Sequence, residues 1–265
     1  MSLERIWLAG CGNMAGAMLD GWLASGMSPE RFLVVRPSGA AVGHGVEVVT
    51  APPARPGPDL LVLGFKPYQL ADAAPAYLPV VRQGTTVLSI LAGVELGSLR
   101  RAFPEAGAIV RAMPNLPVRL GKGVTALVGE DGRENPALTA LLRPLGLVEW
   151  VRSEDALDMV SALAGSGPAF VYRFVDALAA GGEALGLPRA QAERLALATV
   201  AGAGELAAEA DASPRALADR VASRGGSTRR GLDVLDEDGA LDGLVRRTLG
   251  AALARVREMA REARG

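Results

Sequence analysis

A glycine-rich hexapeptide near the N-terminus has the spacing of a dinucleotide-binding turn. It reads Gly10-Cys11-Gly12-Asn13-Met14-Ala15, a G-x-G-x-x-A pattern that directly follows an aliphatic run. The first glycine permits a sharp turn, the second lets the backbone approach a pyrophosphate, and the small sixth residue keeps helix and strand close. The first N–H groups of the following helix would attract the phosphates. The alternative is a structural glycine turn without a ligand, but the strand–turn–helix context favours binding.

The residues after the second expected strand indicate which dinucleotide would bind. That strand ends at Arg36, followed by Pro37 and Ser38, and no acidic residue occurs before Glu47. A site for NAD places a carboxylate here to bind the ribose 2′-hydroxyl, whereas an arginine can fork onto the 2′-phosphate of NADP. We therefore expect NADPH, with NADH as the less preferred cofactor. The alternative is that Arg36 merely solvates the end of the strand.

Two further polar residues follow expected strands, at the sheet edge where open α/β folds bind their ligands. Lys66 comes after Gly64-Phe65 and before Pro67, and Asn115 follows a strand that ends near Pro114. From spacing alone, Lys66 could equally be a charged surface residue that contacts no ligand. Asn115 could place its amide near the nicotinamide or could simply bond local backbone in a turn.

A second glycine cluster lies far along the chain. Ser223-Arg224-Gly225-Gly226-Ser227-Thr228 precedes an expected helical segment that runs from Arg229 to Leu235. Two glycines with hydroxyls at a helix N-terminus form a nest of N–H donors suited to one carboxylate or phosphate. The alternative is an ordinary turn between helices.

The elements that would position these motifs fall into two regions. Residues 1–152 alternate short aliphatic runs with helical stretches, which is typical of a parallel sheet wrapped by helices. Helical stretches are expected at Asn13 to Ala24, Pro67 to Tyr77 and Glu95 to Phe103. The expected strands are Ile6 to Ala9, Phe32 to Arg36, Val46 to Val49, Leu60 to Phe65, Thr86 to Leu91, Ala108 to Ala112, Val124 to Val128 and Leu147 to Arg152.

Residues 153–265 carry a helical pattern without a strand signal. Helices are expected to begin near Pro168, Pro188 and Pro214. In the helix expected from Ala169 to Ala180, apolar residues recur every four positions and form a wide stripe. That stripe fits an internal core helix or a subunit interface, and the amount of apolar surface favours an oligomer. The predicted fold is thus an α/β Rossmann-like dinucleotide-binding domain followed by an all-α helical dimerisation domain.

Composition excludes several classes of function. The formal net charge is −1, so the chain lacks the broad basic face that nucleic acid requires. With a single Cys and a single His, we expect no internal disulfide and no metal site. The longest stretches without a charged residue span 14 residues, too short for a membrane span, and a cytoplasmic protein is expected.

Taken together, the motifs resemble the Δ1-pyrroline-5-carboxylate reductase family over essentially the whole chain. The resemblance is carried by G-C-G-N-M-A at 10–15, F-K-P at 65–67, L-A-G-V at 91–94, R-A-M-P-N-L-P at 111–117, D-A-L-D-M-V-S-A-L-A-G-S-G-P-A at 155–169, and S-R-G-G-S-T at 223–228 followed by G-L-D-V-L. The last stretch is the most specific.

By this resemblance, the chain would use NADPH to reduce pyrroline-5-carboxylate to proline, as a homodimer or a larger homo-oligomer built from dimers. The cofactor would contact Gly10, Cys11, Gly12, Asn13, Met14, Ala15, Arg36, Ser38, Gly64, Phe65, Lys66, Pro67, Leu91, Ala92, Gly93 and Asn115. The substrate would contact Glu154, Ser161, Ser223, Gly225, Gly226, Ser227 and Thr228. Ser223 and Thr228 would be the catalytic residues, with Thr228 beside the ring nitrogen.

The chain departs from the family pattern in two places. Arg224 replaces a usual proline, so the loop is expected to be less rigid and more cationic. Ala51-Pro52 replaces a turn that usually contains asparagine, which leaves one adenosine-ribose contact without its usual side chain.

Three other functions compete with this interpretation. A β-hydroxyacid dehydrogenase would need a lysine in the helical half, and none occurs after Lys122. A non-catalytic NADP-binding regulatory dimer would not need a second anion nest. A reductase of a related cyclic imine would share every motif described above.

Overall fold

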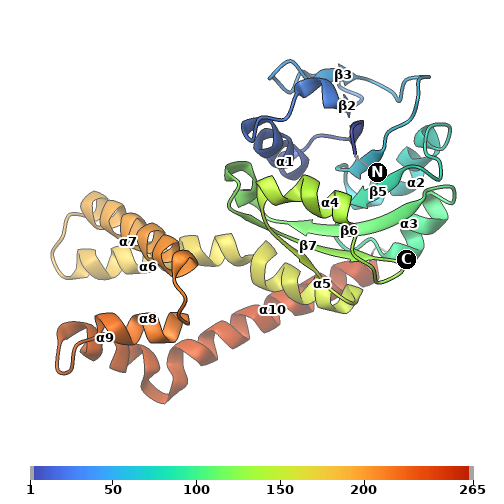
Figure 1. Cartoon of the computed structure of the whole chain (residues 1–265). Helices are drawn as coiled ribbons and strands as arrows, with labels where there is room; N and C mark the ends of the chain where they lie inside the picture. The colour runs from blue at the N-terminus through green and yellow to red at the C-terminus, as the bar shows by residue number, and fades with distance from the viewer. Residues whose placement is uncertain (1–2, 263–265) are drawn as a thin grey trace. The chain divides into compact units, whose positions relative to one another are not determined.

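The structure, a computed structural model, describes residues 3–262 in two compact units. One unit comprises the chain up to Ser166 together with the chain from Ala252 onward, and the other is Gly167–Ala251. In Figure 1 the first unit runs from blue to yellow-green and includes the red end of the last helix, and the second unit runs from yellow to orange-red.

The first unit is built on one eight-stranded sheet with the order β3-β2-β1-β4-β5-β6-β7-β8. Every strand overlaps a range expected from the sequence, and the ends differ by at most two residues. The strands are β1 (Ile6–Ala9), β2 (Phe32–Val35), β3 (Glu47–Val49), β4 (Leu60–Leu63), β5 (Thr86–Ser89), β6 (Ala108–Pro114), β7 (Gly123–Gly129) and β8 (Gly146–Trp150).

One strand pair departs from the expected parallel sheet. β6 and β7 pair antiparallel, with Ala112 opposite Leu127, whereas all other neighbouring strands are parallel. The cause is the short connection, which holds one 3-10 segment, η4 (Leu116–Leu120). A parallel crossover needs a dozen or more residues, so this link allows only an antiparallel return.

The helices of this unit cover both faces of the sheet. The expected helical stretch from Pro67 to Tyr77 is helical throughout, but it consists of three short segments rather than one α-helix. Pro75 has no N–H to donate to Ala71, and its ring disfavours a continuous α-helix. The elements are α1 (Asn13–Ala24), η1 (Pro29–Arg31), η2 (Pro67–Gln69), α2 (Leu70–Ala73), η3 (Ala74–Tyr77), α3 (Leu96–Ala102), α4 (Pro136–Leu142), η5 (Arg143–Leu145), α5 (Glu154–Val160) and a π-helical turn, η6 (Ser161–Gly165).

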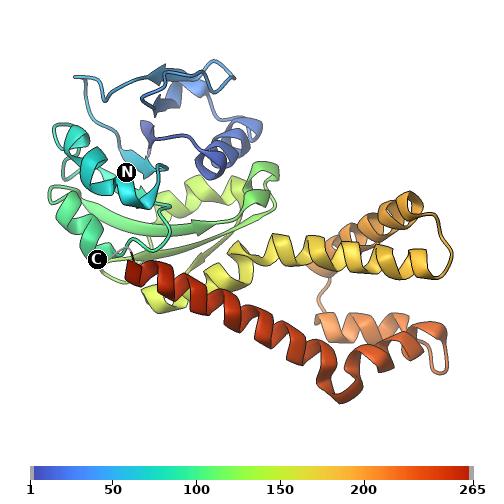
Figure 2. The ribbon, with the colours of Figure 1, turned by 180° about the vertical axis from the view of Figure 1, so that it is seen from behind.

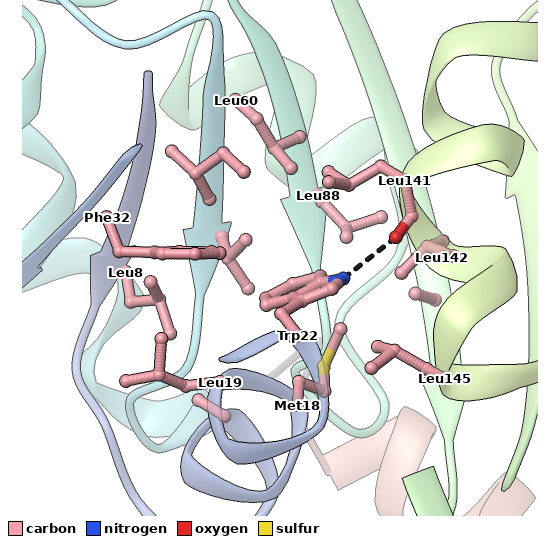
Figure 3. Close-up of a cluster of buried hydrophobic side chains, with 14 of the residues drawn as sticks. Leu8, Met18, Leu19, Trp22, Phe32, Leu60, Leu88, Leu141, Leu142 and Leu145 are labelled. Atoms are coloured by element: carbon pink, nitrogen blue, oxygen red, sulfur yellow. Dashed lines mark hydrogen bonds between the residues drawn. The ribbon is translucent and has the colours of Figure 1, made fainter. Parts of the chain in front are cut away.

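Two apolar cores lie on opposite faces of the sheet, because successive strand residues point to opposite sides. Ile6 and Leu8 of β1 face the core formed with α1 and α4, whereas Trp7 and Ala9 face the core formed with η3 and α3. Figure 3 shows Trp22 of α1 in the first core, with its Nε1 donating a hydrogen bond of 2.8 Å to the Leu141 carbonyl oxygen. This bond ties α1 to α4 and fixes the helix that follows the glycine-rich turn.

The helical unit begins with two long helices, α6 (Gly167–Ala184) and α7 (Arg189–Glu209), which pack against each other and are seen in Figure 2. The expected helix starts are confirmed. Pro168 lies in the first turn of α6 and Pro188 is the N-cap of α7, while the Ser213 hydroxyl accepts a hydrogen bond from the Ala216 N–H. The remaining elements are α8 (Pro214–Val221), α9 (Ser227–Asp236), η7 (Glu237–Gly239) and α10 (Ala240–Glu262).

The apolar stripe of α6 is not a core within the single chain. Val171, Phe174 and Leu178 are 46%, 50% and 43% exposed. Apolar surface exposed to this extent is typical of a face that a further protein surface covers. From residue 3 to residue 262, no helix is both long and apolar enough to cross a membrane.

The compact units do not divide where the sequence pattern changes. The predicted boundary between residues 152 and 153 coincides with the N-cap of α5, whose Ser153 hydroxyl accepts a hydrogen bond from the Ala156 N–H. Compactness instead groups α5 with the sheet and divides the chain after Ser166. The domain boundary at 152/153 therefore remains a prediction.

Candidate functional site

A cavity of about 880 Å³ lies at the carboxyl ends of β1, β2, β4 and β5. The chain runs from β1 to β2 and β3 on one side and then returns to β4 on the other side of β1. Such a reversal of strand order is where open α/β sheets bind their ligands. All six residues of the glycine-rich turn, from Gly10 to Ala15, line this cavity.

The first glycine of the turn is required by both conformation and space. Gly10 has a φ of +83°, and a Cβ built on it would lie 2.9 Å from the Phe65 backbone nitrogen. On the facing strand, a Cβ on Gly64 would lie 2.7 Å from the Ala15 Cβ. The turn and the end of β4 therefore approach so closely that neither glycine could carry a side chain, and residue 15 must be small.

At the second glycine, neither the backbone conformation nor the available space requires glycine. Gly12 is the N-cap of α1 with φ −85° and ψ −165°, and a Cβ built on it would meet only the Gly64 carbonyl oxygen, at 3.9 Å. The protein thus leaves space over Gly12 that it does not fill. No side chain caps α1, and its first turn has no acidic residue, so its N–H groups and partial positive charge are suited to a pyrophosphate.

Charge at the β2 end of the cavity favours a phosphorylated ribose. Arg36 and Ser38 both line the cavity, and none of its described lining residues is acidic. The Arg36 guanidinium makes one long hydrogen bond of 3.4 Å to the Ala40 carbonyl oxygen. Burial raises the pKa of the Cys11 thiol, against the lowering effect of Arg36, so the thiol stays protonated at neutral pH.

The opposite end of the cavity contains most of the residues predicted to contact the nicotinamide. Gly64, Phe65, Lys66 and Pro67 line it after β4, and Leu91 and Ala92 line it after β5. The Lys66 N–H donates a hydrogen bond of 2.8 Å to the Gln69 side-chain oxygen, which fixes the start of η2.

Gly93 and Asn115 do not line the cavity. Gly93 has a φ of +75° and approaches α10, where a Cβ on it would lie 3.2 Å from the Ala260 backbone. The Asn115 amide nitrogen donates to the Ala164 carbonyl oxygen at 3.0 Å, and its amide oxygen accepts from the Val124 N–H at 2.8 Å. The structure therefore favours the alternative for Asn115, a side chain that bonds backbone.

Several lining residues were not predicted from the sequence. Thr50 follows β3 directly, so the rule that ligands bind at carboxyl strand ends could have identified it. Gln69 and Tyr77 line the cavity from η2 and η3. Pro75 signals that the 67–77 segment is divided, but it does not indicate which of its side chains reach the cavity. Burial raises the pKa of Tyr77 far above its usual range, so its hydroxyl is a neutral hydrogen-bonding group.

In the helical unit, Ser223 to Thr228 form a tight turn into α9. The Gly226 N–H donates to the Ser223 carbonyl oxygen at 2.9 Å, and Gly225 has a φ of +75°. Ser223, Gly225, Ser227 and Thr228 are exposed, and no side chain caps the N-terminus of α9. The loop thus presents hydroxyls and helix N–H groups to solvent.

Two arginines beside this loop differ in their contacts. Arg229 forms a salt bridge of 2.6 Å with Asp219, which raises the pKa of Arg229 through that hydrogen bond. Arg224 is exposed. Part of the positive charge expected around the loop is therefore neutralised, and the arginine that replaces the family's proline lies open to solvent.

Glu154 and Ser161, the other predicted substrate contacts, lie in the first unit. The Glu154 Oε1 atom accepts hydrogen bonds from the Arg111 guanidinium at 2.6 Å and from the Leu96 N–H at 2.9 Å. Ser161 is buried at the start of the π-helical turn. Among the described residues, no three His, Cys, Asp or Glu side chains are placed to hold a metal ion.

The topology and cavity define an NAD(P)-binding domain of the oxidoreductase class, joined to a helical unit. Residues 5–93 match the family model described as NADP oxidoreductase, coenzyme F420-dependent. Residues 154–259 match the model described as pyrroline-5-carboxylate reductase dimerisation. The chain belongs to the pyrroline-5-carboxylate reductase family.

Individual relatives cover essentially the whole chain. The chain is 36% identical to a pyrroline-5-carboxylate reductase of Synechocystis sp., over 99% of this chain and 100% of the relative. It is 31% identical to that of Pseudomonas aeruginosa, over 99% of both chains.

Solved structures also match this fold over essentially the whole chain. A pyrroline-5-carboxylate reductase from Coxiella burnetii superimposes with a TM-score of 0.87 at 31% identity, covering 98% of this chain and 99% of that one. A pyrroline carboxylate reductase from Plasmodium falciparum, solved with NADP bound, has a TM-score of 0.80 at 23% identity, covering 98% of this chain and 100% of that one. The latter likeness concerns the fold alone.

Proposed function

We propose that the protein reduces L-Δ1-pyrroline-5-carboxylate to L-proline with NADPH, the last step of proline biosynthesis. The observation that carries this proposal is the full-length relationship to pyrroline-5-carboxylate reductases, which includes both the nucleotide-binding and the helical region. A sensor without turnover would need the first region and a dimer, but not the exposed turn at Ser223 to Thr228.

NADPH is the proposed cofactor, and NADH the less preferred one. The space over Gly12 and the uncapped start of α1 fit a pyrophosphate. Arg36 and Ser38, with no carboxylate in the cavity lining, fit a ribose 2′-phosphate. When bound, the reduced nicotinamide supplies the hydride.

The chain's own task is to hold a small carboxylate and to stabilise the ring nitrogen. We assign the carboxylate to the N–H groups and hydroxyls between Ser223 and Thr228, because an uncapped helix start binds anions. A protonated imine accepts hydride readily at its ring carbon. The Thr228 hydroxyl is assigned to the ring nitrogen, which becomes the amine of proline.

The assembly we propose is a homodimer formed through the helical unit, or a larger oligomer built from such dimers. The exposed apolar face of α6 and the match of residues 154–259 to a dimerisation model support it. Analytical ultracentrifugation of the purified protein tests this assignment, and a monomer at micromolar concentration would contradict it.

The activity is tested by following the loss of NADPH absorbance with purified protein and pyrroline-5-carboxylate, beside parallel reactions with NADH and without the imine. We expect rapid, imine-dependent oxidation that is faster with NADPH. NADPH binding without turnover would favour the regulatory dimer. Turnover with a six-membered cyclic imine carboxylate and none with the five-membered one would favour the related reductase.

A further inference from the structure

A charged arginine lies almost fully buried in the sheet, and the proposed chemistry gives it no role. Arg111 belongs to β6, between Ser89 of β5 and Val128 of β7, and its side chain is 7% exposed. A buried ion pair contributes little to stability compared with an apolar replacement, although it can specify one conformation. Arg111 is therefore expected to fix the position of the groups that it contacts.

The partners of Arg111 come from α5. Glu154 forms a salt bridge of 2.6 Å with its guanidinium, and Asp158, one turn later, lies 4.0 Å away. The charges of Asp155 and of Arg257 on α10 also affect the pKa of Asp158. The pKa of Asp158 is raised because burial outweighs the lowering effect of Arg111. Because its oxygen lies at 2.6 Å, against 4.0 Å for Asp158, Glu154 is the closer partner of Arg111.

Glu154 has a second contact, which links it to the cofactor cavity. The same Oε1 atom accepts the N–H of Leu96, the first residue of α3, and the N-cap residue Glu95 supplies no side-chain cap to that helix. Leu96 ends the short loop that starts at Leu91, and Leu91 and Ala92 line the cavity. Glu154 thus caps α3 from another helix and fixes the end of the loop.

The middle of this loop is fixed separately. Gly93 lies so close to the Ala260 backbone of α10 that a Cβ would approach it to 3.2 Å, and Ala260 is buried. The loop from Leu91 to Leu96 is therefore held by α10 at its middle and by Glu154 at its end. All of these residues belong to the first compact unit.

We propose that the Arg111–Glu154 ion pair positions the Leu91–Leu96 loop to bind the nicotinamide half of the cofactor. Glu154 is a positioning residue in this account and does not bind the substrate. The inference rests on the proposed function for the identity of the cofactor. The ion pair places the carboxylate, the carboxylate fixes the Leu96 N–H, and the loop then presents Leu91 and Ala92 to the cavity.

The test compares Glu154→Ala with Glu154→Gln. The alanine variant removes the acceptor for both partners, whereas the glutamine variant keeps an oxygen for Leu96 but loses the charge facing Arg111. Asp155→Asn is the matched control, because it removes a neighbouring, exposed carboxylate from the same turn of α5. Circular dichroism of each variant checks that the fold is retained.

Two measurements do not depend on turnover. Hydrogen–deuterium exchange of the segment that contains Leu96 is expected to accelerate in Glu154→Ala and to stay unchanged in Asp155→Asn. The affinity for NADPH is expected to fall at least about tenfold in Glu154→Ala, the lower end of the loss that one hydrogen bond to a charged group produces, and by less in Glu154→Gln. The affinity for 2′-phospho-ADP-ribose, which lacks the nicotinamide, is expected to stay unchanged.

Three results would overturn the proposal. One is unchanged exchange and unchanged NADPH affinity in Glu154→Ala. Another is an equal loss of affinity for NADPH and for 2′-phospho-ADP-ribose, which would indicate general damage to the cavity. The third is a higher KM for the imine with NADPH affinity unchanged, because that pattern makes Glu154 a substrate contact. If the wild-type protein binds NADPH but does not reduce the imine, the proposed function fails while the binding and exchange comparisons remain decisive.

Discussion

Gly12→Ala separates cofactor binding from folding, because the structure provides space for the added methyl group. The built Cβ meets only the Gly64 carbonyl oxygen, at 3.9 Å, and the extended backbone of Gly12 is open to alanine. Because alanine is less favourable than glycine at an N-cap, we expect the free energy of unfolding of the cofactor-free protein to fall by no more than about 1 kcal/mol. The methyl group would occupy the space over the start of α1.

The effect on NADPH binding should be large. If the pyrophosphate lies over Gly12, the methyl group displaces it from at least one N–H of α1. Loss of one hydrogen bond to a charged group costs about 1.5–3 kcal/mol, which corresponds to a roughly 10- to 150-fold weaker affinity. The assay is a titration that follows NADPH fluorescence, combined with thermal unfolding of the cofactor-free protein.

Gly16→Ala is the matched control, since Gly16 lies one turn further along α1. Its built Cβ meets only the Cys11 sulfur, at 3.8 Å, so alanine is accepted there as well. A helix-interior glycine replaced by alanine gains about 0.5–1 kcal/mol of stability, and NADPH affinity should be unchanged. An unchanged affinity in Gly12→Ala would refute the assignment of the pyrophosphate to this turn. A large fall in its thermal stability would refute the claim that the space is open.

Substitutions at three further positions test other parts of the account. Arg36→Glu should reverse or strongly reduce the preference for NADPH over NADH, measured as the ratio of kcat/KM values, and an unchanged ratio would show that Arg36 does not contact the 2′-phosphate. Thr228→Ala should lower kcat/KM for the imine by a factor that corresponds to roughly 2–4 kcal/mol if the bond to the ring nitrogen forms mainly in the transition state, while Thr228→Ser should retain most activity. Trp22→Phe should destabilise the protein by about 1–3 kcal/mol in denaturant unfolding, because it leaves the buried Leu141 carbonyl oxygen without its 2.8 Å partner, and a change below the error of the measurement would contradict this.

Most of the first unit could be predicted from local patterns. Aliphatic runs such as Leu60–Leu63 are buried on both faces of the sheet, so each strand has a strong signal of its own. The glycine-rich turn was predictable from its own spacing between a strand and a helix, although the close approach that excludes a side chain on Gly10 comes from Gly64 and Phe65 after β4.

The features that sequence reasoning missed depend on contacts between distant segments. The antiparallel pairing of β6 and β7 is the exception, because the short connection between them already rules out a parallel crossover. One partner of Asn115, the Ala164 carbonyl oxygen, lies 49 residues away, and no spacing rule indicates such a bond. The contact between Gly93 and Ala260 joins residues that lie even further apart in the sequence, since it links the loop after β5 to the end of α10.

Glu154 shows the same limit for function. Its motif suggested a substrate contact, which stays a prediction, but did not indicate the partners that the structure gives its carboxylate, Arg111 and the Leu96 N–H. A resemblance transfers residue types to positions, but the partner of a carboxylate is decided by the fold. The turn at Ser223 to Thr228 is the opposite case, since its geometry arises within six residues and was predictable from them.

The most direct test of the central claim follows the hydride itself. The protein is incubated with pyrroline-5-carboxylate and NADPH dideuterated at C4 of the nicotinamide, and the product is analysed by mass spectrometry and chiral chromatography. The account predicts L-proline that carries one deuterium, at C5, with one NADPH consumed for each proline formed. NADPH that is bound but yields no deuterated proline would contradict it.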